Sequence, residues 1–105
     1  MEDCPVKYAF TVVNGKWKLQ ILWELNQQDM IRFNELQRRL AGISSFMLSK
    51  SLGELEQNKL IIRKQYNEIP PRVEYSLTEL GKAIHPALKM LGDWGTKVYN
   101  KCQES

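Results

Sequence analysis

Two cysteines carry the most reactive side chains of this 105-residue chain, and they lie near its opposite ends, at Cys4 and Cys102. Because they lack the close spacing of metal motifs and of CxxC redox pairs, we expect free thiols in a reducing compartment. Cys4 stands before Pro5 at the expected amino end of a helix, where the helix dipole and the nearby Lys7 favour the thiolate. Thiolates react with oxidants and electrophiles, so Cys4 is predicted to be a sensor; the alternative is an unreactive cysteine.

Residues for other kinds of chemistry are sparse. The single histidine, His85, stands directly before Pro86, and neither a G-x-x-x-x-G-K-[ST] loop nor a G-x-G-x-x-G loop occurs. No group of histidine, cysteine and acidic residues has the sequence spacing that metal ligands have. The sequence therefore predicts neither an enzyme nor a cofactor or metal site, and it predicts a structural role for His85.

The composition fits one modest domain over residues 1–105. Apolar residues make up 43% of the chain, which is enough for a single core. The net charge of +3, from 15 Lys and Arg against 12 Asp and Glu, suits a nucleic-acid-binding protein but is shared by many others. No apolar run approaches the ~20 residues that span a membrane, and Met1–Pro5 lacks the features of a signal peptide. We therefore expect a cytoplasmic protein.

The spacing of apolar residues predicts four helices before the first strand. Pro5 can begin the first helix and Asn14–Gly15 can end it, whereas Asn26–Asp29 has the composition of a turn. Ala41–Ile43 is a short turn before a fourth helix that Ser44 or Ser45 can cap. The predicted apolar faces are Val6, Ala9, Phe10 and Val13, then Trp17, Ile21, Leu22 and Leu25, then Phe33, Leu36 and Leu40, and finally Leu48, Leu52 and Leu55.

From Leu60 onward the apolar period changes to two, which predicts a β-hairpin. Ile62 and Tyr66 lie on one face of its first strand, and Val73, Tyr75 and Leu77 lie on one face of its second. The intervening Asn67–Pro71 must be an exposed loop, because its two prolines cannot donate to a sheet. Thr78 then caps a last helix that Pro86 should kink or restart. The predicted fold is mainly α with a small β-hairpin (α+β): a winged helix-turn-helix with residues 33–58 as helix-turn-helix and 61–77 as wing.

With these elements in place, the chain resembles the HxlR-type family of winged-helix regulators, which are relatives of the MarR-type group. The resemblance rests on Cys4–Val6 with Gly15–Trp17, on Arg32–Leu36 with Gly42–Ser44 and Leu48–Ser49, and on Pro70–Thr78 with Leu80–Gly81. It implies that a homodimer binds duplex DNA sequence-specifically, with the fourth helix in the major groove and the wing near the backbone. Phe46, Ser51 and Gly53 depart from common family residues, which affects the bases that are read and not the fold.

The DNA-binding candidates occupy the exposed side of the fourth helix and the wing. Residues near the amino end of a recognition helix reach base edges, and cations on flanking elements neutralise phosphates. The predicted contacts are Ser44, Ser45, Phe46, Ser49 and Lys50 on the helix, Arg63, Lys64 and Arg72 on the wing, and Lys16 with Lys18 at the start of the second helix. Arg72 is the favoured phosphate contact. For each of these residues, and for Arg32, Arg38 and Arg39, the alternative is ordinary surface charge or polarity.

The terminal helices carry more apolar surface than a core of this size can bury, which predicts a homodimer through residues 1–14 and 79–101. The predicted interface residues are Val6, Tyr8, Phe10, Leu91, Trp94 and Val98. Similar family members pair in this way, and the resemblance implies recognition helices roughly 34 to 36 Å apart on an inverted repeat. Cys102 of one subunit could then approach Cys4 of the other.

Several functional alternatives stay open at this point. The resemblance favours a repressor, and the effector could be an electrophile at Cys4, a small molecule acting on the dimer, or nothing. The rival function is a winged-helix module that binds protein instead of DNA, through the terminal helices or the face around Phe46. Salt dependence separates the two, because DNA binding weakens steeply as the salt concentration rises.

Overall fold

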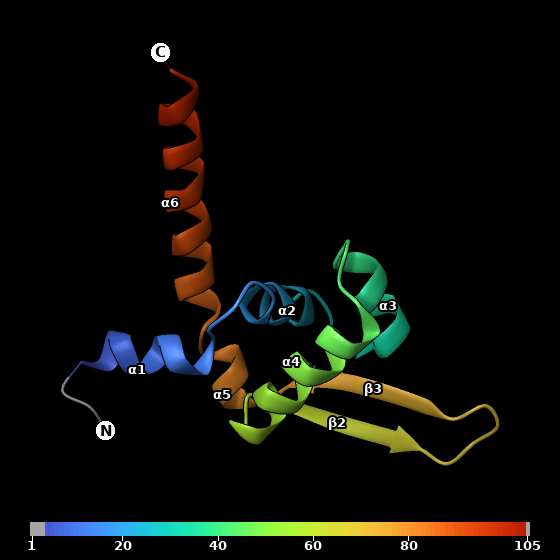
Figure 1. Ribbon diagram of the computed structural model, residues 1–105. Coiled ribbons are helices and arrows are strands. Elements are labelled where there is room, and N and C mark those ends of the chain that lie inside the picture. Colours follow the sequence, from blue (N-terminus) through green and yellow to red (C-terminus); the bar gives the residue numbers. More distant parts are fainter. Residues whose placement is uncertain (1–3, 105) are drawn as a thin grey trace.

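Six helices and one small sheet make up residues 4–104, the part of the chain that the computed structural model describes (Figure 1). Residues 1–3 of the predicted amino-terminal dimerisation segment lie outside the described residues. In chain order the elements are α1 (Pro5–Val12), α2 (Lys18–Leu25), β1 (Ile31–Arg32), α3 (Phe33–Arg39), α4 (Ser45–Gln57), β2 (Ile61–Tyr66), β3 (Arg72–Leu77), α5 (Glu79–Lys82) and α6 (His85–Gln103).

The sheet is antiparallel and has the strand order β1-β3-β2. Strands β2 and β3 form the predicted wing, in which Ile61 pairs with Leu77 and Tyr66 pairs with Arg72. The two-residue strand β1 was not predicted, because it is too short to show a period of two. Ile61 is buried whereas Ile62 is 49% exposed, so the face of β2 that carries Ile62 and Tyr66 is not the one that faces the core.

The core lies where α2, α3 and α4 meet the sheet. The predicted face of α4 is confirmed, because Leu48, Leu52 and Leu55 are fully or almost fully buried. Trp17 packs against the same core, as expected, although it is only partly buried. The other buried apolar residues are Ile21, Leu22, Leu25, Ile31, Leu36, Leu40, Ile43, Leu60, Ile61, Tyr75, Leu77 and Leu88.

The predicted caps hold the starts of two helices. The Ser44 hydroxyl oxygen accepts the backbone N–H of Met47 at 3.0 Å, and the Thr78 hydroxyl oxygen accepts that of Gly81 at 3.0 Å. The last predicted helix is divided: α5 ends at Lys82, and α6 begins at His85 with Pro86 in its first turn. Pro86 therefore restarts the helix, because proline fits a first turn but not a helix interior.

The terminal helices α1 and α6 project from this core (Figure 1). Helix α1 and the wing extend in opposite directions, while α6 stands away from both and has only its first turns against the body. None of the residues of α1 is buried, and Leu88 is the only buried residue of α6. Within the described residues no helix is both long enough and apolar enough to cross a membrane.

Candidate nucleic-acid interface

One side of α4 faces solvent along the first turns of the helix. Because Leu48 and Leu52 anchor the opposite side in the core, Phe46, Ser49 and Lys50 are left exposed, and Phe46 is 76% exposed. A helix held in this way presents hydroxyl, ammonium and aromatic groups at its amino end without needing to move. These groups can donate to or accept from base edges, contact phosphate and pack on a thymine methyl group.

Helix α3 holds the beginning of α4 through an amide that the sequence analysis did not single out. Gln37 Nε2 donates to the backbone oxygen of Ile43 at 3.3 Å and lies 3.2 Å from Ser45 Oγ. Ser44 is exposed, but its hydroxyl oxygen already accepts the capping hydrogen bond. Ser44 therefore starts the helix and Ser45 links it to α3, which leaves Ser49 as the serine of this face with no such bond among the described residues.

The three predicted wing cations lie on two different faces of the sheet. Directly paired residues of antiparallel strands share a face, and successive residues of one strand alternate between faces. Arg63 pairs with the buried Tyr75, whereas Lys64 pairs with Glu74. Arg63 therefore lies on the side that faces α4, and Lys64 lies on the other side together with Arg72 and Tyr66. The sequence predicted one cationic cluster here, and the structure separates its members.

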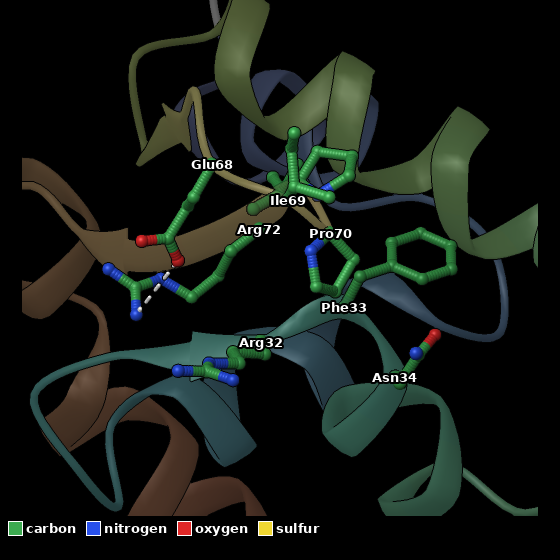
Figure 2. Close-up of a pocket in the computed structure, with 9 residues that line it drawn as sticks. Arg32, Phe33, Asn34, Glu68, Ile69, Pro70 and Arg72 are labelled. Carbon is green, nitrogen blue, oxygen red and sulfur yellow. Dashed lines mark ion pairs between the residues drawn. The ribbon is translucent and has the colours of Figure 1, made fainter.

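Arg72 is engaged within the wing. Its Nη1 is 3.4 Å from Glu68 Oε1 (Figure 2). Its guanidinium carbon lies 4.0 Å from the centroid of the Tyr66 ring, and its Nε is 3.4 Å from Glu74 Oε2. Two carboxylates and an aromatic face therefore compete with any phosphate for this cation. The phosphate contact of Arg72 remains a prediction, and so does that of Lys64, whose Nζ lies 5.0 Å from the same ring centroid.

A cavity of about 710 Å³ separates the wing loop from the start of α3 (Figure 2). Arg32, Phe33 and Asn34 line one side of it, and residues 68–73 line the other. In Figure 2 the Arg32 and Arg72 side chains extend toward the same end of the cavity, while Asn34 lies at the opposite end. Because Glu68 is paired with Arg72, Arg32 is the cation at this opening that has no ion pair among the described residues.

Lys18 does not occupy the position of a phosphate contact. Its side chain is only 7% exposed, and its Nζ lies 2.8 Å from Glu54 Oε1 of α4 and 3.3 Å from Asn14 Oδ1. Lys18 therefore ties the junction of α1 and α2 to α4. Its neighbour Lys16 is exposed, with Nζ 4.8 Å from the centroid of the Trp17 ring, and its predicted phosphate contact stays open.

The Lys18–Glu54 ion pair gives the protein a pH-dependent contribution to stability. The hydrogen bond from Lys18 lowers the pKa of Glu54 below its ordinary value of 4.5. The folded state therefore favours the ionised carboxylate, so this contribution is complete above a pH of about 4.5 and is lost as the pH falls through the lowered pKa. We expect Lys18→Met to flatten this part of the stability profile, measured as the urea midpoint at a series of pH values.

Glu54→Gln is the matched variant, because it removes the other partner of the ion pair, the carboxylate whose protonation makes this contribution depend on pH. It should lower stability more than Lys18→Met does, since it leaves a buried ammonium with Asn14 as its remaining partner, whereas Glu54 without Lys18 stays 44% exposed to water. Unchanged acid sensitivity in both variants would mean that the ion pair does not contribute.

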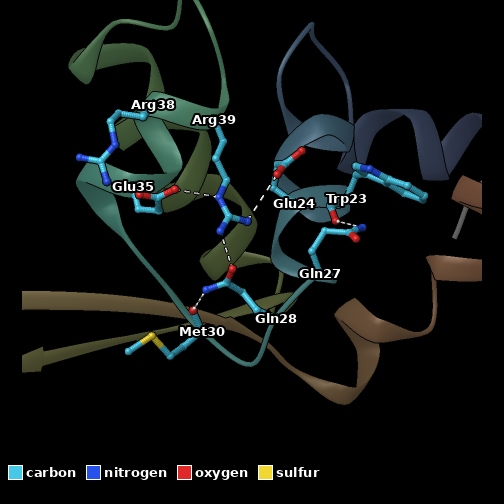
Figure 3. Close-up of polar contacts among 8 residues, drawn as sticks. All are labelled: Trp23, Glu24, Gln27, Gln28, Met30, Glu35, Arg38 and Arg39. Carbon is cyan, nitrogen blue, oxygen red and sulfur yellow. Dashed lines mark hydrogen bonds and ion pairs between the residues drawn. The ribbon is translucent and has the colours of Figure 1, made fainter.

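Arg38 and Arg39 also have partners within the fold (Figure 3). Arg39 Nε lies 3.1 Å from Glu35 Oε2, and Arg39 Nη1 lies 3.6 Å from Glu24 Oε1 of α2. Arg38 pairs with the same Glu35, whose pKa is lowered by the hydrogen bonds from both arginines. Gln28 accepts from Arg39 and donates to the Met30 oxygen, so this network connects α3 to α2 and to the turn between them.

The remaining candidates lie on or beside the terminal helices. His85 stacks on Trp23 with 5.6 Å between ring centroids, and its Nδ1 lies 2.7 Å from Asn26 Nδ2, so it packs α6 against α2. Cys4 and Cys102 are exposed free thiols. All six predicted interface residues are exposed in the single chain: Val6, Tyr8, Phe10, Leu91, Trp94 and Val98.

Comparison with known proteins identifies relatives over nearly the whole chain. Residues 12–103 match a family model described as HxlR-like helix-turn-helix. A relative from Fusobacterium mortiferum, assigned as a regulatory protein MalR, is 44% identical over 92 residues, which cover 88% of this chain and 87% of that protein. A solved structure from Porphyromonas gingivalis W83, assigned to the MarR family of transcriptional regulators, has a TM-score of 0.86 at 43% identity and covers 91% of this chain and 93% of its own. The redox regulator HypR in its reduced form has a TM-score of 0.88 at 33% identity, and the match covers 97% of this chain and 100% of the HypR chain. The winged helix-turn-helix fold predicted from the sequence is confirmed.

Proposed function

Because the chain belongs to the HxlR-like helix-turn-helix family of transcription regulators, we propose that it binds an inverted-repeat operator as a homodimer and represses transcription. The exposed amino-terminal face of α4 is the observation that supports DNA binding most directly. Phe46, Ser49 and Lys50 project from a helix whose other side is buried and whose first turn is capped. Ser45, Phe46, Ser49 and Lys50 are the proposed base-edge contacts, and the wing cations with Lys16 are the proposed phosphate contacts.

The exposed faces of α1 and α6 support the homodimer. Phe10 is 65% exposed and Trp94 is 61% exposed, and each lies on a helix that leaves the core (Figure 1). Apolar surface of this extent is typical of an interface. An inverted repeat requires a two-fold axis that places both copies of α4 on one side of the dimer, and we propose that α1 and α6 pair around such an axis.

The experiment that tests this function is selection of bound sequences from random duplex DNA by the purified, reduced protein. We expect enrichment of an inverted repeat with half-sites about one helical turn apart. Affinity for that repeat should fall by about 10³ or more between 50 and 200 mM salt, if six or more phosphates are contacted. Absence of any enriched sequence at low salt would exclude this function and favour a protein-binding module, whose mainly apolar contacts would change little with salt.

We further propose that oxidation or electrophile modification of Cys4 switches this binding. Cys4 is exposed directly before α1, the helix that carries the proposed interface, and the structural neighbour HypR is named a redox regulator. Repeating the selection after diamide treatment, with the protein and with Cys4→Ala, tests the switch. Loss of binding only when Cys4 is present supports it, and Cys102→Ala shows whether the second thiol takes part. Equal binding before and after oxidation would contradict the proposed role of Cys4 but not the proposed DNA binding.

A further inference from the structure

Helix α1 lies beside α5 (Figure 1), and a cavity of about 420 Å³ separates the two helices next to the turn that joins α4 to β2. We call it the α1–α5 cavity. The residues that line it include Tyr8, Ala9 and Val12 from α1, Asn58 from the turn, and Leu80 and Ala83 from α5 and its end. Neither the family match nor the named relatives assign a role to this cavity.

The size and the lining of the α1–α5 cavity suit an uncharged, mainly apolar small molecule. Ligand pockets commonly have volumes of about 300 to 1,000 Å³. A dry apolar cavity of about 150 Å³ already holds benzene, so this one has room for a molecule of two fused rings. Within residues 4–104 its lining contains no charged side chain. Because burying an ion without a partner is costly, this lining disfavours an ionised ligand.

Two polar groups of the α1–α5 cavity can orient such a ligand. Asn58 Nδ2 donates to the backbone oxygen of Glu54 at 3.1 Å, which leaves Asn58 Oδ1 without a hydrogen bond among residues 4–104. The hydroxyl group of Tyr8 likewise has none within this part of the chain. An amide oxygen accepts, and a phenol donates or accepts, so the pair suits a ligand that carries a hydroxyl group.

Helix α1 makes few contacts of its own with the core. None of its residues is buried, and Val12 in its last turn is the apolar side chain through which it packs against the core. Among the proposed interface residues of α1, Tyr8 lines the cavity, whereas Val6 and Phe10 do not. A ligand in the cavity would therefore add contacts between α1 and α5 and leave most of the proposed interface of α1 uncovered.

We propose that the α1–α5 cavity is an effector site for an uncharged, mainly apolar ring compound with a hydroxyl group, and that its occupation changes operator affinity. The effector role rests on the proposed function, whereas binding of the ligand does not. Only Ala83 and Ile84 separate α5 from α6, so a ligand that fixes α1 against α5 fixes both proposed dimer helices relative to the body that carries α4. A ligand that prefers one arrangement of these helices shifts operator affinity, and couplings of about 5- to 150-fold are typical.

Titration of the purified protein with 1-naphthol, followed by calorimetry, tests the site. We expect 1-naphthol to bind, and 1-naphthoate, which has the same rings and a negative charge, to bind at least about 10-fold more weakly. Ala9→Phe fills the cavity from an exposed position and should abolish binding. Thr11→Phe is the matched control, because it adds the same ring to α1 about 160° around the helix and should bind normally. Tyr8→Phe should weaken 1-naphthol by about 2- to 10-fold and leave the affinity for naphthalene unchanged.

Operator affinity measured with and without saturating 1-naphthol tests the effector role. We expect a change of about 5-fold or more in the unmodified protein and in Thr11→Phe, and none in Ala9→Phe. Absence of binding, or equal binding to Ala9→Phe, would overturn the site, and so would binding only to a monomeric Trp94→Asp variant, since the partner subunit would then fill the cavity. Binding that leaves operator affinity unchanged would overturn the effector role. If the protein enriches no DNA sequence, the proposed function fails, whereas the titration still decides whether the cavity binds the ligand.

Discussion

Replacing Gly81 with alanine should destabilise the folded protein by about 3 kcal/mol, near the upper end of the range for overpacking. The added Cβ would lie 2.0 Å from the backbone oxygen of Leu60 and 3.1 Å from its carbonyl carbon. That oxygen cannot easily move, because it accepts the Thr78 N–H at 3.0 Å and the Thr78 hydroxyl at 3.2 Å. The variant must therefore shift α5 away from the start of β2. Urea unfolding followed by circular dichroism measures the effect.

Gly53→Ala is the matched control for Gly81→Ala. Both glycines lie in helices, but a Cβ on Gly53 meets nothing within 4 Å. Alanine at position 53 should therefore raise the free energy of unfolding by roughly 0.5 to 1 kcal/mol, through helix propensity alone. If Gly81→Ala proves as harmless as this control, α5 can move away from the Leu60 carbonyl at little cost, and the close approach does not limit stability.

The apolar face of α4 and the helix caps could be predicted because residues close together in the sequence determine them. Leu48, Leu52 and Leu55 share one face by helical spacing alone, and Ser44 and Thr78 cap helices through backbone groups three residues away. Strand β1 could not be found in this way, since its two residues are ordered by pairing with distant residues of β3. The sequence also could not show that Ile61, and not Ile62, is the buried residue of β2. The register of β2 against β3 decides this, because it places Ile61 opposite Leu77.

The sequence predicted which helices and strands carry the candidate site, but it did not predict which polar residues pair with one another there. Lys18 and Lys16 look alike in sequence, yet only Lys18 meets a carboxylate from α4, 36 positions further along the chain. Nothing in local spacing indicates such a contact. The separation of Arg63 from Lys64 did have a signal, because adjacent residues of a strand must face opposite sides. Strand alternation applied to cations as well as to apolar residues would have placed them on different faces.

The second large effect is expected at the exposed face of α6. Leu91, Trp94 and Val98 lie within about 60° of one another around the helix and are all exposed, so a charge among them would not disturb the core of a single chain. In a dimer the same charge would be buried without a partner, which is costly. A charged substitution at this face can therefore disrupt the proposed interface without unfolding the single chain.

Trp94→Asp should leave the far-ultraviolet circular dichroism of the protein unchanged and convert the proposed dimer to monomers in sedimentation experiments. Operator affinity should fall by about 10² to 10⁴, because each half-site would then bind without the effective concentration that the partner supplies. Asn100→Asp is the matched control: it adds the same charge to the same helix, about 120° around from Trp94. Dimers and full affinity in Trp94→Asp would place the interface elsewhere, whereas monomers that still bind the full operator tightly would show that pairing of the two α4 helices does not depend on α6.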